Sequence, residues 1–188
     1  SAAVLPGAEV TTRGVCVNPG RLGFLQALEE MGATIGAVVT GTFHGDVVGD
    51  VTVGGGDLRA IEVSGAEVAT MIDELPLLAV VAAHAEGITR VGDAGELRTK
   101  ESDRITTTVA MITALGGGAE AAGDGFSVVG TGFLDPGTVD SYGDHRIAMA
   151  AAVAATGSRG PVRITGAEAA SVSWPGFYEA LEASWSSR

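Results

Sequence analysis

The chain has 188 residues, of which 46% are hydrophobic, so it is long enough and apolar enough to bury a sizeable core in one large domain or two small ones. Its formal net charge is −12, with 23 acidic residues against 11 lysines and arginines. This acidity argues against nucleic acid or an anionic membrane surface as the main partner, because both require a basic face.

The single cysteine, Cys16, lies inside an apolar run. It has no partner for an internal disulfide, which fits a reducing compartment, and we expect a small core residue rather than a catalytic thiol. The longest apolar runs, residues 75–83 and 147–155, are too short to cross a bilayer, and no signal-peptide pattern opens the chain. We therefore expect a cytoplasmic protein without membrane contact.

The first half of the chain alternates strands and helices. Strands are predicted, in chain order, at residues 9–17, 33–39, 47–53, 58–63 and 88–91. A first helix, residues 21–31, has apolar residues near helical spacing. A second helix, residues 77–84, follows Pro76, which suits a first helical turn, and is apolar almost all round. Such a helix is expected to be buried.

The same order recurs in the second half, with an amphipathic helix, a strand, an apolar helix and a strand at residues 104–115, 126–129, 147–155 and 161–165. We therefore predict one domain, residues 1–188, with repeat units at about 8–92 and 96–166 and a partial third unit at 171–188. Strands mixed with wholly apolar helices predict an α/β (α+β) fold with helices packed inside against sheets.

Three charged clusters stand just before or at the start of predicted helices: Asp73-Glu74, residues 100–104 and residues 144–146. Lys100, in the second cluster, is the only lysine of the chain. Helix N-termini suit anions because they present free N–H groups and the positive end of the helix dipole. Equivalent positions of repeated units tend to meet at one face, so we infer one composite anion site that contains an acid/base group.

Each cluster also has a structural interpretation. Asp73 fits a simple helix cap, and Arg146 could pair with Asp144 at a buried helix start. Residues 95–105 could be a solvated loop with weak ion pairs. His145 and His84 could be structural histidines, and no spacing of histidine and cysteine indicates a metal site.

Three stretches carry a resemblance: Asp73 to Pro76, residues 96–104 with Lys-Glu-Ser-Asp-Arg, and residues 142–149 with Asp-His-Arg. Their order and spacing resemble the C-terminal motifs of the 5-enolpyruvylshikimate-3-phosphate synthase family over essentially all 188 residues. The resemblance implies an enolpyruvyl transferase of two domains, each with three similar units, helices inside and sheets outside. This chain resembles the C-terminal domain only. The resemblance therefore implies that the third unit is incomplete and that the N-terminal domain is absent. It also implies that the 188-residue chain is inactive by itself.

The resemblance implies transfer of the enolpyruvyl group of phosphoenolpyruvate to the 5-hydroxyl of shikimate 3-phosphate, releasing phosphate, in aromatic amino acid biosynthesis. No metal or organic cofactor is implied. Asp73 would contact the shikimate hydroxyls and accept the 5-hydroxyl proton. Glu101 would exchange a proton with the methylene carbon, and Lys100 would contact shikimate 3-phosphate.

By the same resemblance, Arg104 and Arg146 would hold phosphoenolpyruvate, with His145 in a supporting position beside Asp144. The chain departs from the family where Val172 stands in place of a lysine that contacts phosphoenolpyruvate in some members. Two alternatives stay open. One is a non-catalytic binding or structural module of the same fold. The other is a relative of UDP-N-acetylglucosamine enolpyruvyl transferase, which shares the fold but lacks this pair of motifs.

Overall fold

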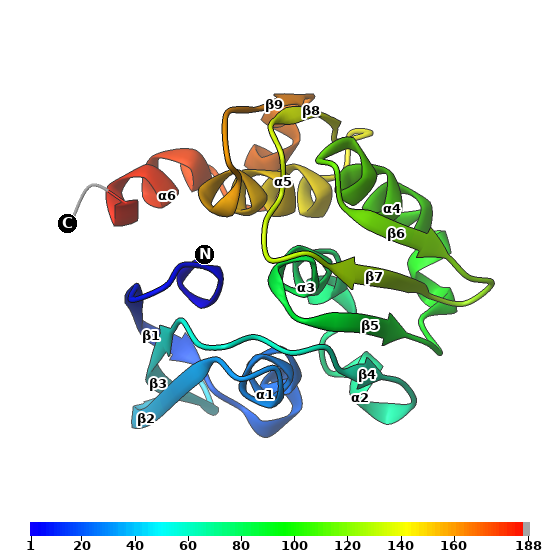
Figure 1. Ribbon diagram of the computed structural model, residues 1–188. Coiled ribbons are helices and arrows are strands. Elements are labelled where there is room, and N and C mark those ends of the chain that lie inside the picture. Colours follow the sequence, from blue (N-terminus) through cyan, green and yellow to red (C-terminus); the bar gives the residue numbers. More distant parts are fainter. Residues whose placement is uncertain (186–188) are drawn as a thin grey trace.

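The first part of the chain forms an antiparallel sheet with a helix beside it (Figure 1) in the computed structural model, which describes residues 1–185. Its elements are η1 (Ala2–Val4), β1 (Glu9–Cys16), η2 (Pro19–Arg21), α1 (Gly23–Glu30), β2 (Thr34–Phe43) and β3 (Asp46–Gly54). β3 lies between β1 and β2 and pairs antiparallel with both. His44 and Gly45 join β2 to β3, and their φ angles of 50° and 93° suit a tight hairpin turn.

A strand, a helix and a parallel strand follow, and this arrangement occurs twice. The six elements are β4 (Glu62–Val63), α3 (Leu75–His84), β5 (Gly87–Val91), β8 (Gly137–Asp140), α5 (His145–Gly157) and β9 (Val162–Thr165). β4 pairs parallel with β5, and β8 pairs parallel with β9. The short helices α2 (Ala66–Ala69) and η3 (Ile72–Glu74) lead into α3.

Between the two crossover units lie η4 (Gly95–Thr99), α4 (Arg104–Ala114), β6 (Gly118–Ala121) and β7 (Phe126–Gly130). β7 pairs antiparallel with β5 and β6, so a four-stranded sheet of order β4-β5-β7-β6 connects the first half to the second. The order of helix, hairpin and crossover is therefore the same in both halves. η5 (Ala167–Val172) and α6 (Phe177–Trp185) follow β9.

The core is built around α3 and α5. Eight of the ten residues of α3 are buried, because this helix is apolar on every side. α5 buries mainly alanine and valine, and small residues let two helices approach closely. Each fully buried Leu or Val of α3 contributes about 1.5–3 kcal/mol through removal of its apolar surface from water. Figure 1 shows β5 and β7 against α3, and β8 and β9 beyond α5. The predicted α/β class with helices inside is confirmed.

Several predicted strands have different bounds in the structure. The strand predicted at 58–63 is reduced to β4, with one isolated bridge from Arg59 to Glu86, since only a short part of this segment lies alongside another strand. β2 continues to Phe43, beyond its predicted end, because the hairpin with β3 keeps it paired. β6 and β8, four residues each, were not predicted, because such short segments carry little alternation.

The prediction that Cys16 is a core residue is wrong, because its side chain is exposed. Cys16 ends β1, a strand at the edge of the described sheet that pairs with β3 on one side and is exposed along most of its length. An apolar run indicates burial only where another layer covers it. Among residues 1–185, every helix is too short or too polar to span a lipid bilayer.

Candidate active site

The starts of α3, α4 and α5 bring the three charged clusters together. Asp73 lies in η3, directly before α3, while Arg104 opens α4 and Arg146 lies in the first turn of α5. Arg104 Nη1 donates to Asp73 Oδ1 at 2.9 Å, and Arg146 Nη2 donates to Asp73 Oδ2 at 3.4 Å. One carboxylate therefore bridges arginines from two other helices, and the three segments meet as the repeat led us to expect.

Arg104 is the centre of this cluster, with 1% of its surface exposed. Besides Asp73, its Nη2 donates to Glu101 Oε2 at 2.6 Å and its Nε to Asp144 Oδ2 at 2.9 Å. Burial disfavours the charged guanidinium, but the hydrogen bonds to Asp144 and the charges of Asp144, Glu101 and Asp73 outweigh it and raise the pKa of Arg104. Arg104 is therefore a buried cation with three carboxylate partners.

Asp144 is fully buried and fixes the start of α5. It caps the helix by accepting the Arg146 backbone N–H at 2.8 Å, and it also accepts Ser102 Oγ at 2.9 Å. Burial opposes its ionisation, but hydrogen bonds from Arg104, the Arg146 N–H and Ser102 lower the pKa of Asp144 below its ordinary value. The alternative of an Arg146–Asp144 side-chain pair is wrong, because the guanidinium that donates to the Asp144 carboxylate is that of Arg104.

Asp73 does not act as a helix cap, since Glu74 takes the N-cap position of α3 and makes no side-chain cap bond. Instead, Asp73 and Glu74 both contact Arg146, each at 3.4 Å. Arg146 is about one third exposed, and its Nε is buried without a hydrogen-bond partner among residues 1–185.

Asp73, Glu74 and Arg146 also line a pocket of about 230 Å³. The rest of the pocket wall is apolar and is formed by Leu77, Met149, Ala150, Val153, Trp174 and Phe177.

Glu101 and Lys100 lie on the solvent side of the cluster. Glu101 is about half exposed, and its Oε1 lies 3.9 Å from Nδ1 of the largely buried His145. Lys100 pairs with the exposed carboxylate of Glu96 rather than with the Arg104 cluster. Five of the six predicted site residues are thus connected by contacts, whereas Lys100 adjoins them only through the chain.

Two further features of the site were not foreseen. The sequence indicated free N–H groups at the helix starts, but Asp103 accepts the Thr106 N–H of α4 and Asp144 accepts that of Arg146 in α5. One backbone N–H at the start of each of these two helices is therefore already bound by a carboxylate of the chain itself. The contact of Ser102, which precedes α4 and donates a hydrogen bond to Asp144, was also not predicted. Nothing in the sequence distinguishes a serine that binds a buried carboxylate from one that is hydrated.

Residues 1–185 contain no group of three His, Cys, Asp or Glu side chains arranged to hold a metal ion.

The fold is that of the enolpyruvyl transferases. EPSP synthase from Acinetobacter baumannii matches with a TM-score of 0.93 and 34% identity, over 97% of this chain and 43% of that one. The enolpyruvyl transferase NikO from Streptomyces tendae matches with a TM-score of 0.74 over 97% of this chain and 40% of that one. Because NikO is only 18% identical, that likeness shows the fold alone.

The family follows from the sequence comparisons. A family model described as EPSP synthase (3-phosphoshikimate 1-carboxyvinyltransferase) matches residues 1–181, so the chain belongs to this family. Curated relatives of that name are 49% identical in Roseiflexus castenholzii and 48% identical in Herpetosiphon aurantiacus. The matches cover 96% and 95% of this chain but only 42% of each relative's length.

Proposed function

We propose that this chain carries one wall of the active site of a cytoplasmic 3-phosphoshikimate 1-carboxyvinyltransferase. The enolpyruvyl group of phosphoenolpyruvate is added to the 5-hydroxyl of shikimate 3-phosphate, and phosphate is then eliminated. The observation that supports this proposal is the convergence of Asp73, Glu101, Arg104 and Arg146 from three helix starts. Addition followed by elimination requires acid and base groups beside cations that hold phosphate and carboxylate.

Arg104 and Arg146 are proposed to hold phosphoenolpyruvate, because guanidinium groups bind carboxylate and phosphate through two parallel hydrogen bonds. Arg146 has the freer side chain, with contacts of 3.4 Å and an Nε that has no hydrogen-bond partner in the described part of the chain. Arg104 already donates to Asp73, Glu101 and Asp144. An anionic substrate therefore replaces Asp73 or Glu101 at Arg104, and this exchange frees that carboxylate for proton transfer.

Glu101 and Asp73 are proposed to handle the two protons of the reaction. Glu101 delivers a proton to the methylene carbon during addition and takes it back during elimination. Asp73 accepts the proton of the attacking 5-hydroxyl and passes it to the departing phosphate, so that both carboxylates return to their starting protonation states. His145 lies 3.9 Å from Glu101 and supports its orientation, while Lys100 turns from Glu96 to the phosphate of shikimate 3-phosphate.

The charge of the cluster indicates that these residues are only part of the complete site. Five carboxylates (Asp73, Glu74, Glu96, Glu101 and Asp144) surround three cations (Lys100, Arg104 and Arg146). Two phosphate-bearing substrates need a site with excess positive charge. Further cations must therefore face this wall, and we propose that they come from an N-terminal domain of the same enzyme. The 188-residue chain alone is expected to release no phosphate.

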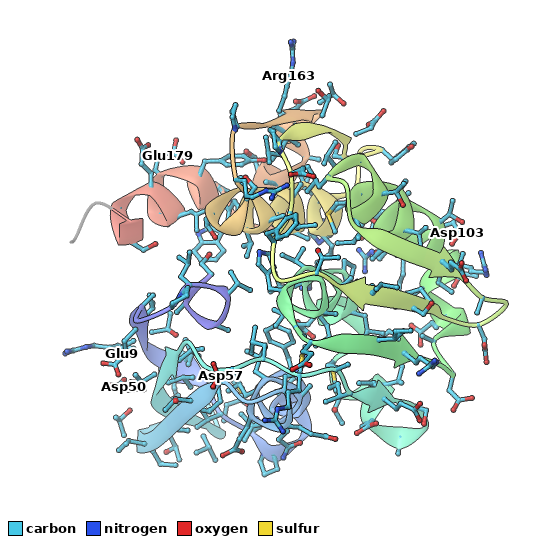
Figure 2. The ribbon with its side chains drawn as sticks, in the orientation of Figure 1. Glu9, Asp50, Asp57, Asp103, Arg163 and Glu179 are labelled. Carbon is cyan, nitrogen blue, oxygen red and sulfur yellow. The ribbon has the colours of Figure 1, made fainter. Side chains whose placement is uncertain are left out.

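The decisive experiment measures phosphate release from phosphoenolpyruvate and shikimate 3-phosphate by the complete gene product that contains these residues. We expect turnover, and we expect Lys100→Met to lower kcat by about 10²-fold or more, because it removes a charge that faces a phosphate. Arg163→Met is the control, since Arg163 is exposed on β9 and points away from the molecule in Figure 2.

Three results would contradict the proposal. Near-normal turnover of Lys100→Met would remove its proposed role. Turnover with UDP-N-acetylglucosamine in place of shikimate 3-phosphate would change the acceptor. A complete, folded protein without transferase activity would favour a binding or structural module.

A further inference from the structure

Arg98 makes contacts that the proposed chemistry does not use. Its Nε donates to the Gly123 carbonyl oxygen at 2.8 Å, and its Nη2 donates to the Ala122 carbonyl oxygen at 2.6 Å. Both carbonyl groups lie in the turn between β6 and β7. A planar guanidinium is suited to bind two neighbouring acceptors at once. Arg98 therefore fastens η4 to the tip of the β6–β7 hairpin.

The third contact of Arg98 connects the two ends of a loop. Its Nη1 donates to Asp103 Oδ2 at 2.6 Å, and Asp103 caps α4 by accepting the Thr106 N–H at 3.2 Å. Figure 2 shows Asp103 at the edge of the molecule, beside the hairpin. Residues 100–102, here called the 100–102 loop, lie between η4 and this cap and belong to no helix or strand. The loop contains Lys100 and Glu101.

The 100–102 loop is thus held from two sides. On the inner side, Ser102 donates to Asp144 at 2.9 Å and Glu101 accepts from Arg104 at 2.6 Å. On the outer side, Arg98 joins both ends of the loop to the hairpin. An irregular segment takes its conformation from its anchors. Lys100 has no inner anchor of this kind, because its side chain pairs with the exposed Glu96.

Stability alone is a weak explanation for this arrangement. The Arg98 and Asp103 side chains are 34% and 37% exposed, and ion pairs this open to water contribute little to the free energy of unfolding. The effect of three simultaneous hydrogen bonds from one rigid group is mainly geometric, because they restrict where the adjoining residues lie.

We propose that Arg98 is a positioning residue that places Lys100 and Glu101 for catalysis by clamping both ends of the 100–102 loop to the β6–β7 turn. This inference rests on the proposed enolpyruvyl transfer. Arg98 acts through the loop and touches neither substrate.

The test compares Arg98→Gln and Arg98→Lys in the complete gene product. Arg90→Gln is the matched control, because Arg90 is also an exposed arginine but, among residues 1–185, its one ion pair is a 3.5 Å contact with Glu62. The measurements are kcat, KM for both substrates, the thermal unfolding midpoint, and amide hydrogen exchange of residues 99–103. We expect Arg98→Gln to lower kcat by about 10- to 100-fold with a smaller change in KM, because small misplacements of catalytic groups have effects of this size.

Arg98→Gln should also speed hydrogen exchange in the loop while the unfolding midpoint stays close to that of the wild type. Arg98→Lys should recover only part of kcat, because an ammonium cannot span Asp103 and two carbonyl groups. The control should match the wild type. A kcat of Arg98→Gln within about twofold of wild type, a loss that only follows the unfolded fraction, or full recovery by lysine would overturn the proposal.

If Arg98→Gln does not fold, Arg98→Lys decides the question, since a normal kcat in that variant refutes the clamp and a lowered kcat at a normal unfolding midpoint supports it. If the wild-type gene product shows no turnover, the proposed function fails. Hydrogen exchange of residues 99–103 then still tests the clamp, because unchanged exchange in Arg98→Gln refutes it without any assay of activity.

Discussion

Replacing Asp144 by alanine tests the interpretation of Arg104 as a buried cation held by carboxylates. Asp144 has no exposed surface and accepts two hydrogen bonds from Arg104, at 2.9 and 3.3 Å. The substitution leaves the Arg104 guanidinium, which is 1% exposed, without its most buried partner. It also removes the acceptor of the Arg146 N–H at the start of α5.

The expected cost follows from these contacts. Removing one partner of a buried ion pair costs about 3–5 kcal/mol, and losing a helix cap costs about 1 kcal/mol. Asp73 and Glu101 stay on Arg104 and offset part of this loss. We therefore expect the free energy of unfolding to fall by about 3 kcal/mol, which lowers the unfolding midpoint by about 6–12 °C in a chain of this size.

The measurement is denaturant and thermal unfolding of the 188-residue chain. Asp135→Ala is the control, because Asp135 forms an ion pair with Arg159 in which both side chains are at least 40% exposed. That pair is expected to contribute about 0–1 kcal/mol. Equal stability of the two variants would refute the reasoning, since the buried carboxylate would then contribute no more than an exposed one.

Three further predictions follow from the same structure. The pKa values of Asp144 and Asp103 lie below the ordinary 3.8, so their contribution to stability is present above that pH and is lost as the pH falls through the lowered values. Acid unfolding curves should show this loss, and Asp144→Asn should reduce it; an unchanged curve would contradict the assignment. Cys16 is exposed, so the native chain should react fully with a thiol reagent such as Ellman's reagent within minutes, whereas a need for denaturant would show that the thiol is covered. Gly130→Ala should destabilise the chain by about 1–3 kcal/mol, because a Cβ there would overlap the backbone carbonyl of Ala85. Gly20→Ala is the control and should be nearly neutral, because a Cβ at Gly20 would meet open space. Equal thermal unfolding curves for the two variants would contradict the predicted overlap at Gly130.

Local patterns were enough to predict most elements. The apolar residues of α3 and α5 indicated buried helices, and the position of Pro76 in the first turn of α3 agreed with the structure. Such patterns depend on neighbouring residues in one helix or strand, so they are readable without the rest of the molecule. The short strands β6 and β8 were missed because their pairing partners, not their own residues, make them strands.

The sequence indicated which residues form the candidate site, but it did not indicate which of their side chains contact one another. Charged groups at the starts of three predicted helices indicated that Asp73, Arg104 and Arg146 belong to one site, and the helix starts do meet. The sequence did not predict which carboxylate pairs with which arginine. Asp144 is two residues from Arg146 in the chain, yet its carboxylate forms an ion pair with the side chain of Arg104. That choice depends on how α4 and α5 pack.

The sequence by itself determined the family, the order of the longer helices and strands, and the set of residues available for chemistry. It did so because motif spacing and helical periodicity are properties of the chain. Only the tertiary structure decided that Arg104 is buried among three carboxylates, that Arg98 joins the 100–102 loop to the β6–β7 turn, and that Cys16 faces solvent. These features depend on distances between segments that are remote in sequence, and packing of helices and sheets sets such distances.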